Sequence, residues 1–421
     1  MASTATSIAE ICAAARRASR VLATLDSAVR DQALEAIAAA LIENSDTILE
    51  ANERDLEAGA DSGLSDALMD RLALDERRVE QMADGVRQIV ALPDPVGEVI
   101  DGSTLPNGLW MRRVRVPLGV VAVVYEARPN VTIDAAALCL KSGNAIVLRG
   151  SSMAAHSNAA LAAVATRVAV EAGLPPGALS HISGGGREEL AELATQNETV
   201  DLIIPRGGEG LKAALKGVAT VPVIFAASGN NHVYVDARAD LDMAREVVLN
   251  AKLQRPGVCN AAENLLVHAD VAARFLPGVL RDLDDAGVVL HGDGRARAAA
   301  GTVEMAEAVD EDWDTEYLAL ELAVGVVDSV QEAITHVNAH GSGHSEAIVT
   351  SDIGAARAFQ LGVDAACVYV NASTRFTDGG EFGMGAEIGN STQKLHARGP
   401  IALRELCTFK YLVEGSGQIR A

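Results

Sequence analysis

The chain has 421 residues, of which 49% are hydrophobic and 22% are charged, with both signs interspersed. This length exceeds one ordinary hydrophobic core and predicts two or three globular domains. The net charge of −22 argues against nucleic acid or an anionic membrane as a partner, because both are bound through basic patches. No apolar run of about 18 residues and no signal-peptide pattern occurs, so we expect a soluble, cytoplasmic protein that acts on a small molecule.

Residues 1 to about 92 carry apolar side chains at helical spacing, and Pro93 and Pro95 end that block. Between residues 99 and 118, Asn107-Gly108 separates two β-like runs, which predicts a hairpin. Because this hairpin interrupts an α/β chain, we expect it to project and to pair with another chain through its edge. Residues 408–413 read as a terminal strand that can pair with the hairpin.

Short, fully apolar runs alternate with helical stretches through the rest of the chain, which predicts βαβ units and parallel sheets. Such sheets bind ligands at the carboxyl ends of their strands. In a second block, from 231 to 371, a capping box of Ser329 and Glu332 starts a helix that ends at Gly341. The predicted strands are 120–125, 145–148, 181–183, 200–204, 221–225, 347–350 and 366–370, and the polar residues 378–385 are predicted to form a loop over the site.

Three strand ends of the first block have the composition of a dinucleotide phosphate site. The strand ending at Arg149 runs into a hydroxyl-rich helix start, where helix amides and a guanidinium fork hold phosphate well. Glycines follow two further strands, at 184–186 and 207–210, but the full G-x-G-x-x-G fingerprint is absent, so simple turns and a surface arginine remain open. The candidate cofactor residues here are Arg149, Gly150, Ser151, Ser152, Gly207 and Gly208.

The candidate nucleophile is Cys259, in the sequence Gln254-Arg255-Pro256-Gly257-Val258-Cys259-Asn260. A thiolate attacks carbonyl and acyl-phosphate carbon directly. Most free cysteines are small buried apolar residues, so the local sequence alone leaves both interpretations open. The scattered, odd set of cysteines is neither a disulfide framework nor a zinc site and is typical of a reducing compartment. The five cysteines are Cys12, Cys139, Cys259, Cys367 and Cys407.

Two further groups of polar residues each allow more than one interpretation. Glu126, Arg128 and Asn130 follow a buried strand, which suits either a site or an ion pair that stabilises the loop. Three histidines recur every four residues, but the helix ends before the third and no further ligand lies close by. A polar pocket wall is therefore favoured over zinc, and a solvated helix end remains open. The histidines are His336, His340 and His344.

The order of these pieces resembles the aldehyde dehydrogenase superfamily over nearly the whole chain. The likeness rests on residues 140–144 before the cofactor strand, on Cys259 in a Gly-x-Cys context, and on Glu316 in Thr315-Glu316-Tyr317. More narrowly, residues 333–348 and 382–400 resemble the glutamate-5-semialdehyde dehydrogenases, also called gamma-glutamyl phosphate reductases. The second of these stretches is long and specific, and it favours Cys259 as a nucleophile.

This resemblance implies an aldehyde-dehydrogenase-like α/β fold in three parts. A parallel-sheet dinucleotide-binding domain spans 1–230, interrupted by a flap hairpin at about 99–118. An α/β catalytic domain spans 231–371, and 372–421 returns to the cofactor domain and supplies the last strand of a small β oligomerisation flap. The flap implies a homo-oligomer, either a dimer or a tetramer.

The implied reaction is the NADPH-dependent reduction of L-glutamyl 5-phosphate to L-glutamate 5-semialdehyde, with phosphate release through a Cys259 thioester. It is the second step of proline synthesis from glutamate, and channelling of the substrate from a glutamate 5-kinase is an open possibility. The resemblance gives Asn130 and the Cys259 N–H as oxyanion donors and Glu316 as a ligand of the nicotinamide ribose. It assigns the glutamyl end to His336, His340, His344 and Phe382.

Three departures from the superfamily pattern carry information. Where hydrolytic members have a general-base glutamate, this chain has Ala226-Ala227-Ser228-Gly229, which suits a thioester that must survive until hydride or phosphate attacks it. Ser152 stands where NAD-preferring relatives hold a carboxylate, so a 2'-phosphate is accepted. An ungapped register places Glu126 at the oxyanion position, and Asn130 reaches it only with a shift.

Two alternative functions remain open at this stage. A coenzyme A-acylating aldehyde dehydrogenase also works without a hydrolytic base. A non-catalytic dinucleotide-binding protein that kept the fold is the other alternative, and the presence of both Cys259 and Glu316 disfavours it.

Overall fold

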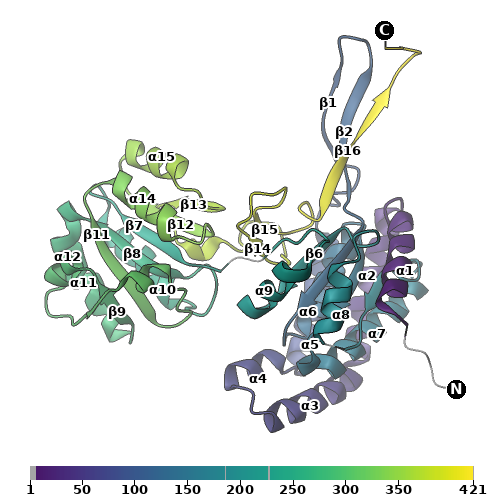
Figure 1. Cartoon of the computed structure of the whole chain (residues 1–421), viewed down its shortest axis with the longest axis horizontal. Coiled ribbons are helices and arrows are strands. Elements are labelled where there is room, and N and C mark those ends of the chain that lie inside the picture. Colours follow the sequence, from purple (N-terminus) through teal and green to yellow (C-terminus); the bar gives the residue numbers. More distant parts are fainter. Residues whose placement is uncertain (1–5, 185, 226–227, 421) are drawn as a thin grey trace. The chain divides into compact units, whose positions relative to one another are not determined.

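The computed structural model describes residues 6–184, 186–225 and 228–420, which fall into two compact units (Figure 1). Unit 1 comprises Met1–Phe225, Gly383–Gly389 and Ile401–Ala421, and unit 2 comprises Ala226–Phe382 and Asn390–Pro400. The C-terminal part of the chain therefore contributes to both units. Within the described residues, no helix is long and apolar enough to cross a membrane.

Helices precede the first strand of unit 1, as the apolar spacing predicts. Ser7 begins the first helix with a capping box, because its hydroxyl accepts the Glu10 N–H at 3.3 Å and its own N–H reaches the Glu10 carboxylate at 2.9 Å. The block ends at Ala91, before Pro93. These helices are α1 (Ile8–Leu22), α2 (Ser27–Glu43), α3 (Ser45–Asp61), α4 (Asp66–Leu72) and α5 (Glu76–Ala91).

The sheet of unit 1 has the strand order β5-β4-β3-β6, and all its pairs are parallel. Its two central strands, β3 and β4, are buried along their whole length, which explains their continuous apolar sequence. The elements are β3 (Val120–Tyr125), α6 (Asn130–Lys141), β4 (Ala145–Arg149), η1 (Ser152–Ala154), α7 (Ala155–Glu171), β5 (Leu179–His181), α8 (Arg187–Ala194), β6 (Leu202–Arg206) and α9 (Glu209–Val218).

One predicted strand of this sheet is wrong. Residues 221–225 form only an isolated parallel bridge between Val223 and Ile203. Pro222 lies inside this run and has no N–H to donate to a ladder, which limits the pairing. The apolar side chains of this run are typical of a buried strand, but the missing N–H of Pro222 weakens its pairing.

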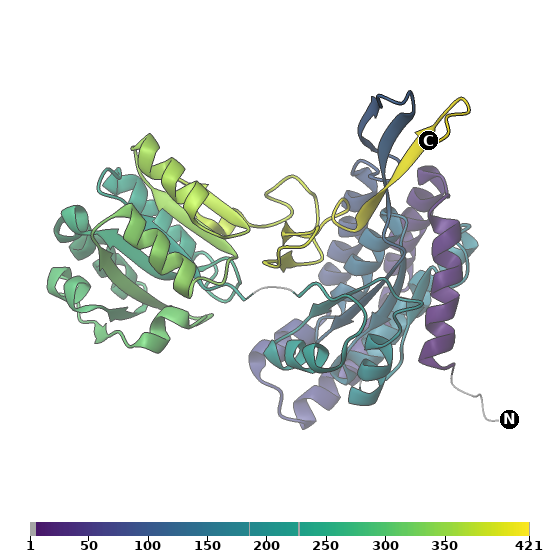
Figure 2. The same ribbon diagram turned by 45° about the horizontal axis from the view of Figure 1, so that its top comes forward.

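A separate antiparallel sheet joins β1 (Val99–Thr104), β2 (Trp110–Pro117) and the C-terminal strand β16 (Cys407–Glu414) in the order β1-β2-β16. The hairpin and the terminal strand run side by side in both views (Figure 1 and Figure 2). This confirms the predicted pairing of the tail with the hairpin edge. Several large apolar side chains of this sheet are exposed, among them Trp110, Phe409, Tyr411 and Val413.

Unit 2 is built on a seven-stranded parallel sheet with the order β10-β9-β11-β8-β7-β12-β13. One face packs against α10, α11 and α12, and the other packs against α14 and α15. The elements are β7 (Asn231–Val235), α10 (Leu241–Leu253), β8 (Ala262–His268), α11 (Ala269–Asp285), β9 (Val289–Gly292), α12 (Gly294–Ala299), β10 (Ala306–Glu307), α13 (Asp310–Asp314), β11 (Glu321–Val327), α14 (Val330–His340), β12 (Ser345–Val349), α15 (Ile353–Gly362), β13 (Cys367–Val370), η2 (Thr374–Phe376), β14 (Asn390–Ser391) and β15 (Gly399–Pro400).

The predicted cap of α14 is present in a modified form. The Ser329 hydroxyl accepts the Glu332 N–H at 3.2 Å, and the helix ends before Gly341, as the sequence predicts. The Glu332 carboxylate, however, accepts the N–H of Asp328 at 2.7 Å, one residue before the position that the capping box requires.

A buried ion pair fixes the nucleophile region within unit 2. Lys252, on α10, donates to Glu263, on β8, at 2.6 Å, and both side chains are fully buried. The second oxygen of Glu263 accepts the N–H of Leu318 at 3.2 Å. Leu318 has a φ of 54°, a left-handed conformation that is rare for a leucine, so this hydrogen bond helps to hold a strained loop.

Lys252→Met should lower the free energy of unfolding of unit 2 by about 3–5 kcal/mol, because it leaves the Glu263 carboxylate buried without its cation. Arg245→Gln, on the same helix, is the matched control: its ion pair with Asp282 is solvent-exposed, and its loss should change stability far less. Denaturant unfolding monitored by far-UV circular dichroism measures both. Equal effects of the two substitutions would contradict the role given to the buried pair.

Candidate active site

Cys259 lies in the turn between α10 and β8 and is half-buried. Backbone groups of this turn take part in the hydrogen bonds that fix it. The Cys259 carbonyl oxygen accepts a hydrogen bond from the Asn231 side-chain amide at 2.8 Å. The next residue, Asn260, is buried and donates through its own amide to the carbonyl oxygens of Arg375 and Thr377 at 3.2 and 2.9 Å. The nucleophile turn is therefore held from two sides.

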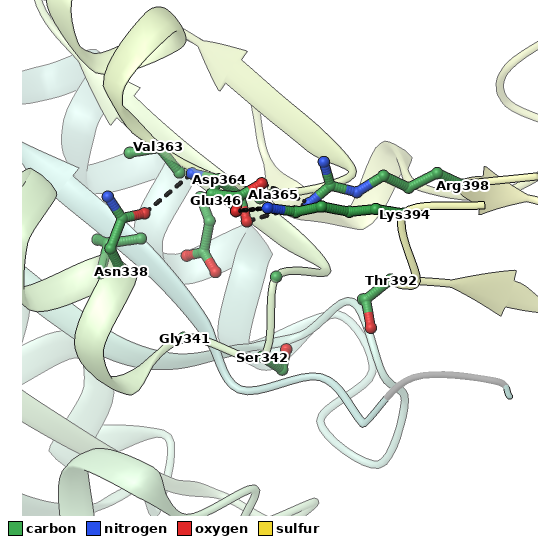
Figure 3. Close-up of a pocket in the computed structure, with 12 residues that line it drawn as sticks. Asn338, Gly341, Ser342, Glu346, Val363, Asp364, Ala365, Thr392, Lys394 and Arg398 are labelled. Atoms are coloured by element: carbon green, nitrogen blue, oxygen red, sulfur yellow. Dashed lines mark hydrogen bonds and ion pairs between the residues drawn. The ribbon is translucent and has the colours of Figure 1, made fainter.

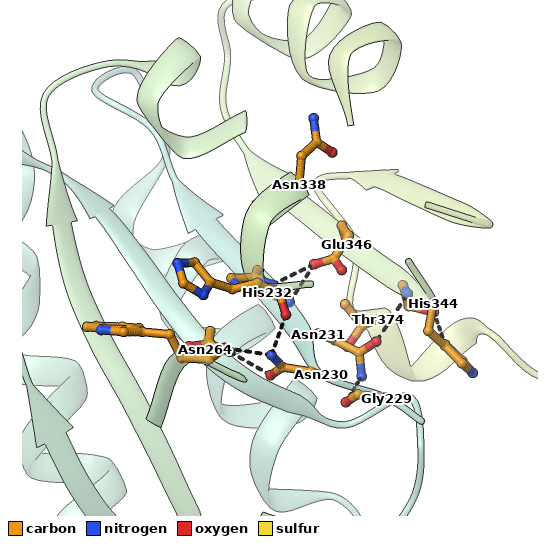
Figure 4. A network of polar contacts seen from close by, with 12 residues as sticks. Gly229, Asn230, Asn231, His232, Asn264, Asn338, His344, Glu346 and Thr374 are labelled. Carbon is orange, nitrogen blue, oxygen red and sulfur yellow. Dashed lines mark hydrogen bonds and ion pairs between the residues drawn. The ribbon is translucent and has the colours of Figure 1, made fainter. Parts of the chain in front are cut away.

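Asn231 joins three segments of the chain at the nucleophile turn, and Figure 4 shows its side chain beside Gly229. Besides the Cys259 carbonyl oxygen, its amide nitrogen is within hydrogen-bond distance of the carbonyl oxygens of Gly229 at 2.8 Å and of Ala261 at 2.6 Å. Its oxygen accepts the N–H of Ser345, the first residue of β12, at 3.1 Å. The side chain is fully buried, so each of these bonds forms away from competing water.

Gly229 brings Glu316 next to the nucleophile turn. The N–H of Gly229 donates to the Glu316 carboxylate at 2.6 Å. A Cβ at position 229 would overlap the backbone oxygen of Cys259, so only glycine fits there. Of the stretch in which the hydrolytic base is missing, Ser228 and Gly229 are described, while Ala226 and Ala227 lie outside the described residues.

The three predicted histidines fall into two groups. His336 packs against His340, Trp313 and His232, at ring-centroid distances of 4.6, 5.0 and 5.4 Å respectively. Burial lowers the pKa of His336 to about 4 and the pKa of His232 to about 3, so both rings are neutral near pH 7.

His344 lies apart from that cluster, at the start of β12, and is buried. Its Nδ1 is 2.7 Å from the Ser345 hydroxyl, which is 2.6 Å from the Thr377 hydroxyl. Thr377 continues to the Tyr369 hydroxyl at 2.7 Å. Burial lowers the pKa of His344 to about 4. The remaining predicted substrate residue, Phe382, is exposed and contacts the Tyr369 ring at 6.5 Å between centroids.

A cavity of about 430 Å³ opens between the end of α14 and the hairpin of β14 and β15 (Figure 3). Buried Glu346 accepts the N–H of His232 at 2.6 Å, and burial raises the pKa of Glu346 well above its usual value. Its second oxygen has no hydrogen-bond partner among the described residues, nor has the Ser342 hydroxyl. Asp364 pairs with Lys394 and Arg398 at the rim. The cavity is thus lined with groups that suit a small polar molecule.

The predicted cofactor residues of β4 lie together at its carboxyl end in unit 1. Arg149 is buried and donates to the Gly186 carbonyl oxygen at 2.6 Å. Its Nε atom and the Ser151 hydroxyl are buried with no hydrogen-bond partner among the described residues. Burial lowers the pKa of Arg149 and the nearby Glu189 raises it. A side chain at Gly150 would overlap the Asn158 amide, and Ser152 is exposed at the start of η1.

Gly207 and Gly208 form the turn between β6 and α9, and Glu126 occupies that turn. The Glu126 carboxylate accepts the N–H of Gly208 at 3.0 Å, at the N-terminus of α9, where a negative charge is favourable. A Cβ at Gly207 would lie 2.6 Å from the Glu126 carboxylate carbon. Asn130 begins α6 and donates to Asp134 at 2.8 Å. Gly185, in the third glycine-rich stretch, lies outside the described residues.

Sequence reasoning missed Asn231, Glu189 and Arg375. Arg375 follows the carboxyl end of β13, and the rule that ligands bind at strand ends could have identified it. The sequence around Asn231 and Glu189 carries no comparable pattern. Asn231 binds backbone carbonyl oxygens, and Glu189, on α8, lies near Arg149.

Comparison with known proteins agrees with this architecture. The model of the aldehyde dehydrogenase family matches residues 1–310. Gamma-glutamyl phosphate reductase from Moorella thermoacetica is 56% identical over 406 residues, covering 96% of this chain and 97% of the relative. The same-named protein from Thermobifida fusca is 52% identical over 413 residues, covering 98% of each.

Solved structures give the same result. The crystal structure of gamma-glutamyl phosphate reductase from Thermotoga maritima is 44% identical, with a TM-score of 0.96, and covers 98% of this chain and 99% of that chain. An acetylating aldehyde dehydrogenase from Geobacillus thermoglucosidasius is 19% identical, covers 98% of this chain and 97% of that chain, and has a TM-score of 0.68, which shows the shared fold alone.

The chain therefore belongs to the aldehyde dehydrogenase family and has the α/β fold of that family, as the order of its motifs predicted. Within the family it groups with the gamma-glutamyl phosphate reductases, oxidoreductases of amino-acid biosynthesis, as residues 333–348 and 382–400 indicated.

Gly229→Ala should lower the free energy of unfolding by about 1–3 kcal/mol, because the added methyl overlaps the Cys259 backbone. It should also reduce turnover more than this loss of stability explains, since the nucleophile turn must move. Gly257→Ala is the control in the same turn, where a Cβ would lie 3.6 Å from the nearest atom and is tolerated. Thermal melts measure the stability of both variants, and steady-state assays measure their turnover. Full activity of Gly229→Ala would show that the nucleophile turn tolerates the added methyl.

Proposed function

We propose that the chain catalyses the NADPH-dependent reduction of L-glutamyl 5-phosphate to L-glutamate 5-semialdehyde, with release of phosphate, in proline biosynthesis. The observation that supports it best is the meeting of Cys259 and Glu316 at Gly229 within unit 2. The relatives that the chain matches over nearly their whole length carry the name of an enzyme for this substrate.

Cys259 acts as the nucleophile in this proposal. Its thiolate attacks the acyl-phosphate carbonyl carbon and forms a thioester as phosphate leaves. The Cys259 N–H stabilises the oxyanion of the tetrahedral intermediate, and Asn130 is the proposed second donor. The turn is fixed through Asn231, Asn260 and Gly229, so the Cys259 backbone does not have to reorganise as charge develops.

The end of β4 fits a phosphate group of the cofactor. The Arg149 Nε and the Ser151 hydroxyl are buried donors that lack a partner among the described residues, and a phosphate oxygen would satisfy both. We assign the 2'-phosphate to this group, with Ser152, Gly150, Gly207 and Gly208 beside the cofactor and Glu316 at the nicotinamide ribose. When bound, NADPH supplies the hydride that reduces the acyl group on Cys259 to the aldehyde.

The amino-acid end of the substrate is assigned to His336, His340, His344 and Phe382. The chemistry of the histidines supports this assignment. Burial keeps the His336 and His344 rings neutral, so each ring can donate one hydrogen bond and accept another. The exposed apolar side chains of the β1-β2-β16 sheet support a homo-oligomer in which this sheet is an interface. We also propose that the substrate is channelled to this enzyme from a glutamate 5-kinase.

Cys259→Ala should abolish the reverse reaction of semialdehyde, phosphate and NADP, with a loss of at least about a thousandfold, because no other group can form the thioester. Cys12→Ala, in α1, is the control and should remain active. NADPH absorbance measures both. Residual activity of Cys259→Ala above a trace would refute the assignment, and turnover that requires coenzyme A in place of phosphate would favour the acylating alternative.

Arg149→Ala should reduce the preference for NADPH over NADH, measured as a ratio of kcat/KM values, by roughly ten- to a hundredfold, which is the value of a charge-assisted hydrogen bond. Arg167→Ala, on exposed α7 surface, should leave the ratio unchanged. An unchanged ratio in Arg149→Ala would show that the 2'-phosphate binds elsewhere.

A further inference from the structure

The short helix η2 is attached to the nucleophile turn by hydrogen bonds in both directions. The Thr374 hydroxyl donates to the Asn260 carbonyl oxygen at 2.7 Å. The Asn260 amide donates in return to the carbonyl oxygens of Arg375 and Thr377. Both partners are inside unit 2, and Thr374 and Asn260 are buried. The position of the Arg375 backbone relative to Cys259 is therefore fixed by the fold.

The Arg375 side chain is fixed as well. Its Nε donates to the Gln254 side-chain oxygen at 2.8 Å, so the guanidinium is oriented by a residue of the same turn that carries Cys259. Gln254 and Asn260, which flank Cys259 in sequence, both hold Arg375. The arginine is half-buried, which increases the strength of its electrostatic interactions.

The charges around Arg375 suit a dianion. Burial lowers the pKa of Arg375 and the nearby Arg255 lowers it further, while Cys259 and Asp378 raise it. Arg255, Cys259 and Asp378 therefore lie close enough to Arg375 to affect its charge. In the proposed mechanism the Cys259 thiolate loses its negative charge when it is acylated, and Asp378 is then the remaining anion among the groups that affect Arg375. The site is then left with excess positive charge at the moment when phosphate departs.

We propose that Arg375, with Arg255 as a second cation, binds the phosphoryl group of the acyl phosphate and the phosphate released from it. This inference rests on the proposed function. In the forward step the Cys259 Sγ forms a bond to the carbonyl carbon, and the bond between that carbon and the phosphate oxygen breaks. The phosphate leaves with the electron pair and takes up the proton that the thiol gave up, as HPO₄²⁻.

The α-carboxylate of the substrate is the competing ligand for a guanidinium. The phosphate is attached to the carbon that Cys259 attacks, whereas three carbon atoms separate that carbon from the α-carboxylate. Arg375 is fixed by the residues that flank Cys259, so the phosphate is the group that comes within its reach. A planar guanidinium also binds phosphate oxygens in pairs, which a lysine cannot do.

The reverse reaction tests this directly, because phosphate is then a separate substrate. Arg375→Gln should raise the KM for phosphate roughly ten- to a hundredfold, the worth of one charge-assisted contact, with little change in the KM for semialdehyde or NADP. Arg375→Lys should raise the KM for phosphate less than Arg375→Gln does. Arg255→Gln should also raise it less, and because Arg255 is exposed this substitution should not impair folding. Arg357→Gln, on the exposed face of α15, is the matched control.

A burst assay separates this inference from the proposed function. Without phosphate, the enzyme with semialdehyde and NADP should form about one NADPH per active site and stop at the thioester. The same burst amplitude is expected for Arg375→Gln. No burst in the unaltered enzyme would refute the proposed function itself. Three results would each overturn the assignment of Arg375 to phosphate. The first is a normal burst with an unchanged KM for phosphate in Arg375→Gln and Arg255→Gln. The others are a higher KM for semialdehyde alone and loss of the burst in Arg375→Gln.

Discussion

The buried side chain of Asn231 is the constraint on which the candidate active site depends. One amide connects the segment at Gly229, the turn at Cys259 and the first residue of β12, through backbone groups. An unsatisfied buried carbonyl oxygen or N–H costs about 1–3 kcal/mol, so separating these segments would lower the stability of unit 2. Because the contacts are to the backbone, they fix the path of the chain around Cys259.

The other features of the site follow from this fixed turn. Gly229 can pass close to Cys259 only because it lacks a Cβ, and its N–H then holds Glu316. The buried pair of Lys252 and Glu263 braces the same region from α10 and β8 and holds the loop after Glu316 through the Leu318 N–H. On the far side of the turn, Asn260 holds η2 and with it Arg375. The arrangement presents a thiol with a cation beside it, which suits an acyl group whose leaving group is an anion.

Much of the fold could be predicted because it depends on local patterns. The buried runs at 120–125 and 145–148 are continuously apolar, and the α14 helix carries its own start and stop signals. The run at 221–225 has the same apolar composition, but Pro222 has no N–H to donate to a neighbouring strand. A pattern of apolar side chains does not reveal this missing backbone donor. The end of the helix at Gly341, predicted from the sequence, separates His344 from His336 and His340, but the hydrogen bond of His344 to Ser345 could not be predicted.

The residues of the site were less predictable than the strands that carry them. Cys259 and Glu316 could be identified from a resemblance, since each lies in a short recognisable context. Asn231 and Arg375 contact residues 28 and 121 positions distant, respectively, so a local pattern could at most have placed Arg375 after a strand end and could not have given either contact. Within unit 1, the donors at Arg149 and Ser151 were predicted from composition, but the approach of Glu189 to the same arginine was not.

The central claim is that Cys259 carries the glutamyl group as a thioester. The most direct test incubates the enzyme with glutamate semialdehyde and NADP in the absence of phosphate, quenches in acid, and analyses the peptides by mass spectrometry. We expect a glutamyl adduct on the peptide that contains Cys259, and this adduct should disappear when phosphate is added before the quench. An adduct on another residue, or turnover with no adduct under conditions that preserve thioesters, would contradict it.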